Sequence, residues 1–275
     1  MRYLFLLLII SVSYSNDQIP GIEQKRPILL RGGTLHTVSG DVLEEHDLLF
    51  AEGKIITIDE QIQPSPDTDI YEIYGKHVVP GYVAGYTRIG LTEISAVKQT
   101  NDHSEIGEIN PNVRANVAYN PDSDLIPVTR SNGILTVNSA PSSGRIPGQS
   151  SVMSLDGWTW EDATLKHPAA LNINWPYMYV DYDKNRKKND KIQKDEYKQQ
   201  IRELDQLIQN VRAYHKRKSA KERKAEHKQK TDLRLESMIP FVIYKDPIHI
   251  NADDIRQIEA AAKWANEHDL NIIIV

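Results

Sequence analysis

The stretch from Gly75 to Thr87 reads Gly-Lys-His-Val-Val-Pro-Gly-Tyr-Val-Ala-Gly-Tyr-Thr, and the pattern of the chain changes across it. Before it, short β-branched runs over residues 28–73 are separated by breaks that contain glycine, such as Gly32-Gly33. Runs and breaks of this kind are typical of β-hairpins. We therefore expect a small β subdomain over residues 22–76 and a second unit over residues 77–275.

Beyond Thr87 the apolar runs alternate little, and apolar residues at helical spacing predict a helix over residues 251–268. In this helix, Asp253-Asp254 is interpreted as favourable charge at the N-terminus. Strands with little alternation, joined by helices, are typical of a parallel sheet with helices on its faces. We expect four such strands, near Val79–Tyr86, Gly133–Asn138, Pro247–Ala252 and Asn271–Val275.

The composition excludes several classes of protein. Of the 275 residues, 26% are charged and 40% are hydrophobic, which is typical of a globular protein and not of a disordered or collagen-like one. The chain contains no cysteine. This excludes disulfides, cysteine-ligated zinc, iron–sulfur clusters and a thiol nucleophile.

A basic segment interrupts an otherwise acidic chain. Residues 184–230 hold 17 Lys and Arg against 7 Asp and Glu, whereas the formal net charge of the whole chain is -5. An apolar stripe at helical spacing runs from Tyr197 to Tyr214 and disappears from Lys216 onward. Because acidic residues interrupt the basic run and aromatic residues do not interleave with it, we interpret the segment as a solvated helical insert and not as a nucleic-acid site.

The first residues are typical of an export signal. Arg2 precedes an unbroken apolar run from Leu4 to Ile10, and Ser13-Tyr14-Ser15 has the small-x-small pattern of a cleavage site. The run is shorter than the about 20 residues that cross a bilayer, and a lipoprotein would need a cysteine. We expect residues 1–15 to be a signal peptide, with no membrane anchor after cleavage and a periplasmic or secreted mature protein.

Several motifs together resemble one family. Gly75–Gly81, followed by a strand that ends at Ile89-Gly90-Leu91, resembles the entry to the amidohydrolase superfamily. Other segments are similar to its exported, imidazolonepropionase-like branch: Gly90–Ile94, Asn120–Ser123, Leu125–Val128, Gly148–Ser151, Leu155–Asp162 and Ala170–Pro176. The resemblance implies an α/β fold, in which a small β-sandwich subdomain precedes about four strands of a TIM-like (β/α)8 barrel with residues 184–230 as an insert.

The resemblance also implies an activity. Members of this branch are metal-dependent hydrolases of C–N bonds other than peptide bonds, and a cyclic amide is the type of small-molecule substrate. One or two divalent metal ions, such as zinc, would activate a water molecule. The first barrel strand of the family ends in Asp-x-His-x-His, and a period of two places both imidazoles on one face at the barrel mouth.

This chain departs from that motif at three positions. Ala84 replaces the aspartate, while Tyr86 and Arg88 replace the two histidines. A phenol is a poor metal ligand near neutral pH, and a guanidinium cannot lose its proton. A later ligand position of the family corresponds to Asn251. We therefore expect no catalytic residue, no metal ligand and no bound cofactor in this chain, and we interpret the isolated histidines, among them His77, His103, His167 and His249, as structural or solvated.

The family's remaining ligands would follow Val275, so we expect the chain to be the N-terminal part of such a barrel. Two interpretations stay open, and with them the question of whether the chain is an enzyme. One is an amidohydrolase-family protein that is inactive in this chain, and the other is a non-catalytic fragment or an exported binding module without a metal centre. Open sheet edges such as Leu270–Val275 also favour self-association.

Overall fold

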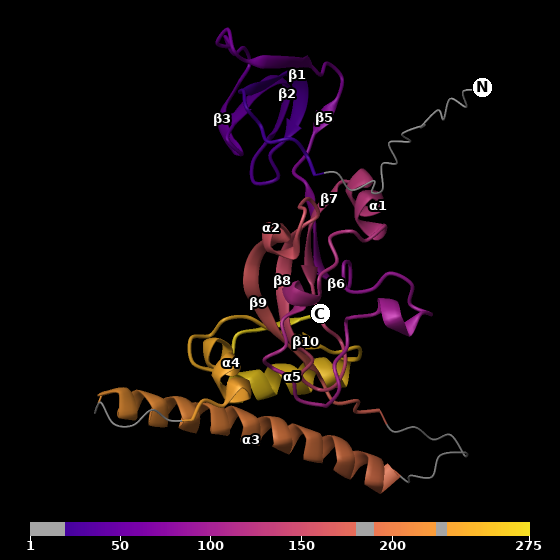
Figure 1. Ribbon diagram of the computed structural model, residues 1–275, viewed down its shortest axis with the longest axis vertical. Coiled ribbons are helices and arrows are strands. Elements are labelled where there is room, and N and C mark those ends of the chain that lie inside the picture. The colour runs from indigo at the N-terminus through magenta and orange to yellow at the C-terminus, as the bar shows by residue number, and fades with distance from the viewer. Residues whose placement is uncertain (1–19, 180–189, 224–229) are drawn as a thin grey trace, which may run out of the picture.

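The computed structural model describes residues 20–179, 190–223 and 230–275. The predicted signal peptide, residues 1–15, lies outside the described residues, as do residues 180–189 and 224–229 next to or within the basic insert. The described chain forms an α/β structure with two sheets (Figure 1). Among these residues, no helix is both long enough and apolar enough to cross a membrane.

The first sheet contains five strands in the order β3-β2-β1-β4, with β5 also paired to β1. The strands are β1 (Ile28–His36), β2 (Val42–Ala51), β3 (Lys54–Asp59), β4 (Asp69–Glu72) and β5 (His77–Val78). The turn between β2 and β3 is Glu52-Gly53, and both residues have positive φ, 50° and 69°. Two positive φ angles define the turn that matches the twist of a tight hairpin, so the glycine-containing break determines this antiparallel pair.

Asp47 holds the first sheet together from within. Its carboxylate is 3% exposed and accepts hydrogen bonds from the main-chain N–H groups of Gly32, at 2.9 Å, and Ile62, at 3.0 Å. The guanidinium of Arg31 lies 3.8 Å away. A buried carboxylate is stable only with partners of this kind, so this one side chain ties β1, β2 and the loop after β3 together.

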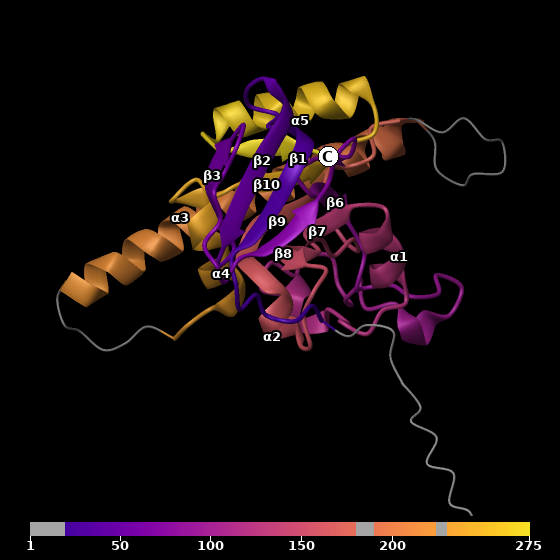
Figure 2. The same cartoon turned by 90° about the horizontal axis from the view of Figure 1, so that it is seen from above.

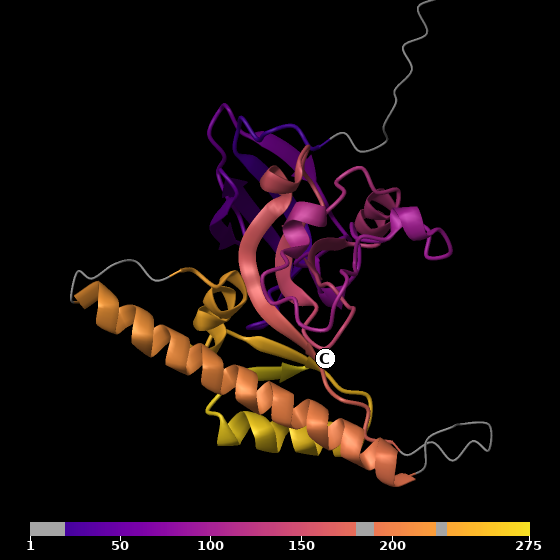
Figure 3. The same ribbon diagram turned by 60° about the horizontal axis from the view of Figure 1, so that its bottom comes forward.

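The second sheet contains six strands in the order β11-β10-β9-β8-β7-β6. They are β6 (Tyr82–Thr87), β7 (Ile134–Ser139), β8 (Gly148–Ser154), β9 (Thr164–Asn174), β10 (Ile248–Asn251) and β11 (Ile272–Ile274). Neighbouring strands are parallel, except that β8 is antiparallel to both β7 and β9. Figure 3 shows the sheet curling, most clearly along β9.

The apolar runs predict four of these six strands, β6, β7, β10 and β11, and miss two. The prediction of an all-parallel sheet is wrong at β8. Its sequence, Gly-Gln-Ser-Ser-Val-Met-Ser, is rich in small polar residues and lacks an apolar run. β9 contains Pro168, which disfavours a strand because proline cannot donate to the ladder. Ser150 and Ser151 are nevertheless fully buried, so tertiary packing overrides the local signal here.

Three helices cover one face of the second sheet: α3 (Asp190–Arg223), α4 (Leu233–Val242) and α5 (Ile255–Glu267). The apolar stripe of the basic insert is confirmed, because Leu204, Ile208, Val211 and Tyr214 are buried in the main core with Ile248 and Ile250 of β10. α3 is also fixed to α5, since the Asp205 carboxylate accepts a bond of 2.7 Å from Trp264 Nε1 and lies 2.9 Å from His268 Nε2. The expectation of a solvated insert is therefore wrong over the middle of α3, which is docked on the sheet and on α5.

Four short elements lie near the strands that carry a second, smaller core. They are the helices α1 (Leu125–Ser131) and α2 (Trp160–Ala163) and the single turns η1 (Lys98–Thr100) and η2 (Ala115–Ala118). A smaller core of Tyr119, Ile126, Val137 and Met153 lies beneath α1 and α2. Figure 2 shows α1 and α2 toward one end of the row of strands and α5 at the other. The polar side chains described next lie on β6, β7, β9 and β10.

Candidate functional site

The carboxyl ends of four mutually parallel strands meet at one edge of the second sheet. β6, β7, β9 and β10 end there at Thr87, Ser139, Asn174 and Asn251. In sheets of this class, ligands bind at the carboxyl ends of the strands, where the loops begin. This edge is therefore the candidate functional site.

One face of the sheet is polar at this edge. β9 and β10 pair Asn172 with His249 and Asn174 with Asn251, and residues paired in neighbouring strands point to the same face. The apolar residues between them, Leu171, Ile173, Ile248 and Ile250, are buried against the helices on the other face. The alternation thus places amide and imidazole side chains together on the face opposite the helices.

Asn251, which the motif places at a ligand position of the family, is engaged by a neighbouring amide. Its Nδ2 donates to Asn174 Oδ1 at 3.4 Å. Asn174 in turn donates from Nδ2 to the carbonyls of Ser142, at 3.1 Å, and Gly144, at 2.6 Å. These bonds connect the ends of β9 and β10 to the loop after β7. In this arrangement Asn251 helps to hold Asn174, which is bonded to the loop after β7.

Tyr86, at the first histidine position of the family motif, packs against His249. The two rings meet edge to face, with centroids 6.0 Å apart and planes at 68°. Burial raises the pKa of the Tyr86 phenol, an effect that Arg88 partly offsets, and burial lowers the pKa of the His249 imidazole. Because a raised phenol pKa and a lowered imidazole pKa both favour the uncharged form, this pair is neutral at neutral pH.

Arg88 adds a fixed positive charge beside this pair. It is exposed, one residue beyond the end of β6. Burial lowers the pKa of His103, and the charge of Arg88 lowers it further. A positive charge of this kind also disfavours a second cation in the same place.

These residues do not fit the divalent ion that the family motif implies. Metal ligands must be deprotonated, but the Tyr86 phenol is held neutral and Arg88 is a permanent cation. Over the parts of the chain that the structure describes, no group of three His, Cys, Asp or Glu residues is arranged to hold a metal ion. The chemistry of the residues at the Asp-x-His-x-His positions is therefore the reverse of what a metal site needs.

Four buried polar atoms near this edge have no hydrogen-bond partner among the described residues: Tyr86 Oη, Asn138 Oδ1, Asn172 Oδ1 and His249 Nδ1. The two amides are oriented by their nitrogens, because Asn138 Nδ2 donates to the Gly85 carbonyl at 3.1 Å and Asn172 Nδ2 donates to the Gly148 carbonyl at 2.9 Å. Both amide oxygens are thus left as acceptors. Unpaired buried polar groups are rare in proteins and call for an explanation.

The sequence pattern did not single out Asn138 or Asn172. The sequence nevertheless holds a sign of both residues, because each is an asparagine directly after an apolar strand residue, Val137 or Leu171. A polar side chain inside a buried run is informative in a way that a buried leucine is not. What the sequence could not provide is the contact between Tyr86 and His249, which depends on the curl of the sheet.

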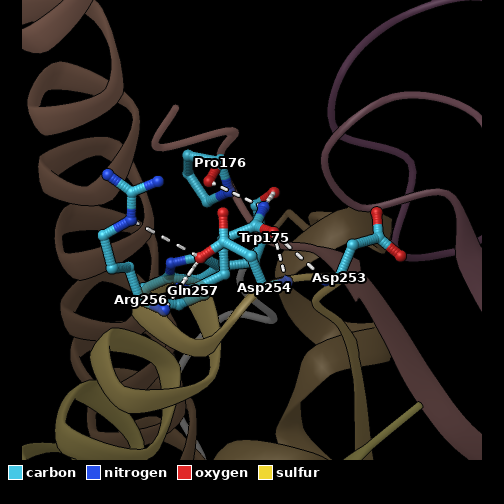
Figure 4. Close-up of polar contacts among 6 residues, drawn as sticks. All are labelled: Trp175, Pro176, Asp253, Asp254, Arg256 and Gln257. Carbon is cyan, nitrogen blue, oxygen red and sulfur yellow. Dashed lines mark hydrogen bonds and ion pairs between the residues drawn. The ribbon is translucent and has the colours of Figure 1, made fainter. Parts of the chain in front are cut away.

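A capping box fixes the loop after β10 (Figure 4). Asp254 accepts from the N–H groups of Arg256, at 2.8 Å, and Gln257, at 3.1 Å, and Gln257 Oε1 accepts in return from Asp254 N–H at 3.2 Å. The Gln257 amide also donates to the carbonyls of Trp175 and Pro176 after β9. The interpretation of Asp254 as helix-terminal charge is confirmed, and the Asp253 carboxylate points away from these contacts in Figure 4.

His167 belongs to a second polar group, on β8 and β9. Its Nδ1 lies 2.8 Å from Ser151 Oγ, and Arg114 Nε donates to its Nε2 at 3.1 Å. Because Arg114 can only donate, Nε2 is an acceptor and Nδ1 carries the proton. His167 therefore cannot take a proton from Ser151 through Nδ1, and the pair is not a catalytic dyad.

The unpaired Tyr86 hydroxyl leads to a stability prediction. Replacing Tyr86 with phenylalanine removes a buried oxygen without a partner, so the free energy of unfolding should stay unchanged or rise by up to about 1 kcal/mol. Urea unfolding measures this free energy. The matched control is Tyr214→Phe, which removes a 2.8 Å bond to Glu236 and should lower the free energy by about 1 kcal/mol. A comparable loss in Tyr86→Phe would show that the hydroxyl is bonded in solution.

Comparison with known proteins supports the superfamily. No protein-family model and no curated protein matches the chain. An amidohydrolase from Thermotoga maritima has a similar structure, with a TM-score of 0.76 and 25% sequence identity over 90% of this chain and 63% of that chain. This chain thus spans less than two thirds of the length of that amidohydrolase.

Two weaker structural matches cover less of the chain. A prolidase complexed with N-methylphosphonate-L-proline is 19% identical over 40% of this chain and 25% of its own, with a TM-score of 0.28. Another amidohydrolase is 22% identical over 24% of this chain and 16% of its own, with a TM-score of 0.23. Of these three matches, the Thermotoga maritima protein alone supports the fold. The described residues have the fold of that amidohydrolase, and this likeness supports the assignment of the chain to the amidohydrolase superfamily.

Proposed function

We propose that this chain is a non-catalytic protein of the amidohydrolase fold, which binds a small polar molecule at the carboxyl ends of β6, β7, β9 and β10. Under this proposal the second sheet is part of a TIM-like (β/α)8 barrel and the first sheet is its β-sandwich subdomain. The similarity to the Thermotoga maritima amidohydrolase supports both assignments. The export signal over residues 1–15 would deliver the protein to the periplasm or the cell exterior.

This proposal rests on one observation: Tyr86 and Arg88 occupy the two positions at which the family motif has metal-binding histidines. A hydrolase of cyclic amides, as the imidazolonepropionase-like motifs imply, needs a water molecule activated by a metal ion. Tyr86 is instead held neutral against His249, beside the cation of Arg88. Hydrolysis of a C–N bond at these positions would therefore lack its activating group.

The unpaired atoms favour binding of a neutral molecule. Asn138 and Asn172 each present a carbonyl oxygen, and Tyr86 and His249 each present an uncharged polar atom. Two acceptors of fixed direction suit a ligand with N–H or O–H donors, and a neutral ligand avoids the cost of burying an unpaired charge. The class we propose is a small, uncharged compound that carries amide or hydroxyl hydrogens.

A zinc-retention experiment tests the absence of a metal centre. The purified chain, loaded with zinc and then dialysed, should retain no more zinc by mass spectrometry than the variant His249→Ala, so that an ion bound elsewhere on the chain is not counted. The double variant Tyr86→His, Arg88→His should gain retained zinc, because two imidazoles replace the phenol and the cation, and the ring of His249 packs against position 86. The control is Tyr86→Gln, Arg88→Gln, which removes the same side chains and supplies no imidazole.

Two outcomes would contradict the proposal. Stoichiometric zinc in the wild-type chain that is lost on His249→Ala would place a metal ion at this edge of the sheet. Failure of the double histidine variant to exceed the glutamine control would show that residues 86 and 88 are not what prevents metal binding. The first result would favour hydrolysis, and the second would show that the exchange at residues 86 and 88 does not carry the proposal.

A further inference from the structure

Two histidines meet on the first sheet, far from the edge described above. β1 and β5 are parallel and pair Thr34 with His77. His36 follows Thr34 by two residues, so it lies on the same face of β1. His36 Nε2 and His77 Nδ1 are 2.9 Å apart, and the ring centroids are 5.1 Å apart with planes at 39°. His77 is exposed and His36 is partly buried.

We propose that His36 Nε2 and His77 Nδ1 bind one divalent late transition-metal ion, such as Zn²⁺, Cu²⁺ or Ni²⁺. In the metal-free pair, one nitrogen donates a hydrogen and the other accepts it. Each imidazole can carry its single proton on its other nitrogen instead. Both facing nitrogens then present lone pairs to the same point, and no net charge has to be removed.

The spacing of the two nitrogens suits a shared ion. Two imidazole nitrogens on one tetrahedral zinc, each at about 2.0–2.1 Å, lie about 3.3–3.4 Å apart. The observed separation is 2.9 Å, so the rings need to move apart by only about 0.5 Å. Because His77 is exposed, such a movement meets little resistance and an ion can enter from solvent.

The pair also predicts which ions bind and how strongly. No third His, Cys, Asp or Glu completes a metal-binding group with these histidines within the described ranges, so water would fill the other positions and the affinity would be moderate. Affinity should follow the usual order for imidazole ligands, with Cu²⁺ bound more tightly than Ni²⁺ or Zn²⁺. Mg²⁺ and Ca²⁺ prefer oxygen ligands and should not compete.

A bound ion would fasten the end of the first sheet. β5 contains only two residues, and its pairing partner is β1. β6 begins at Tyr82, four residues after β5 ends. An ion held by both histidines would tie β5 to β1 where the chain leaves the first sheet for the second. The site would thus stabilise the junction between the two sheets, and it is independent of the function proposed for the second sheet.

Calorimetric titration of the untagged chain tests this site, with CuCl₂, NiCl₂ and ZnCl₂ as separate probes at about pH 7.5. We expect one equivalent of each ion to bind and the melting temperature to rise. His36→Asn and His77→Asn should each weaken binding about tenfold or more, because one of two ligands is lost.

His46→Asn is the matched control, since His46 lies on β2 of the same sheet and its ring bonds the Glu44 carbonyl. It should bind metal as the wild type does. Circular dichroism melts without metal show whether each variant is folded, and His36→Gln and His77→Gln provide a second pair of substitutions. Equal affinity in the wild type and the His36 and His77 variants, or no binding by the wild type up to about 1 mM, would overturn the proposal. All these variants keep Tyr86, Arg88 and His249, so the outcome is separate from the zinc-retention result.

Discussion

Replacing Ile208 with alanine is expected to lower the free energy of unfolding by about 2–5 kcal/mol. Ile208 is 1% exposed and lies in the main core, where α3 packs against β10 and α5. Truncation removes buried methyl and methylene groups and leaves a cavity, because the strands beneath cannot collapse to fill it. Urea unfolding followed by circular dichroism measures the loss.

The control for this prediction is on the same helix. Ile192 is 44% exposed, and its replacement by alanine should change the free energy of unfolding by about 0.5 kcal/mol or less. Both substitutions change helix propensity by the same amount, so the difference between them reports burial. Equal effects would mean that α3 is not docked on the sheet in solution.

Acidification is expected to destabilise the fold through His167. Burial and the neighbouring charge of Arg114 lower the pKa of His167 from 6.5 to about 4. The folded state therefore favours the neutral ring, and the ring binds a proton more readily when the chain unfolds. The stability that this provides is complete above about pH 6.5 and is lost as the pH falls toward about 4. The expected loss is about 2–3 kcal/mol.

The variant His167→Gln separates this effect from general acid denaturation. It removes the titrating ring, so its free energy of unfolding should fall less steeply between about pH 6.5 and pH 4 than that of the wild type. His46→Gln serves as the comparison, because the His46 ring bonds a main-chain carbonyl in the first sheet. If the wild type and His167→Gln lose stability in parallel over this range, the protonation of His167 is not the cause.

Local patterns predicted those parts of the fold that depend on local chemistry. The Glu52-Gly53 break predicts its hairpin because two positive φ angles are needed there. The apolar run that contains Ile248 predicts β10 because that strand is buried. β8 was missed because its strand character comes from packing, and small polar residues such as Ser150 become buried only when neighbouring strands cover them.

The candidate site was predicted in part for a related reason. The motif around Pro80-Gly81 locates Tyr86 and Arg88 by counting along one strand, and it needs no tertiary information. The contacts between Tyr86 and His249 and between His36 and His77 join residues far apart in the sequence. Periodicity along the chain carries no signal for such contacts. His77 and His249 therefore appear isolated in the sequence, although in the fold His77 contacts His36 and His249 contacts Tyr86.

α3 is much longer than the part of it that is buried in the core. At 1.5 Å per residue, its 34 residues extend for about 50 Å, but among its described side chains, up to residue 220, the fully buried ones lie between Leu204 and Tyr214. The first turns, from Asp190 to Lys198, are mostly exposed and contribute charge without filling the core. Whole turns can be gained or lost there without repacking the sheet. Such a helix end tolerates insertions, and an epitope tag or a fluorescent reporter could be introduced there without disturbing the rest of the molecule.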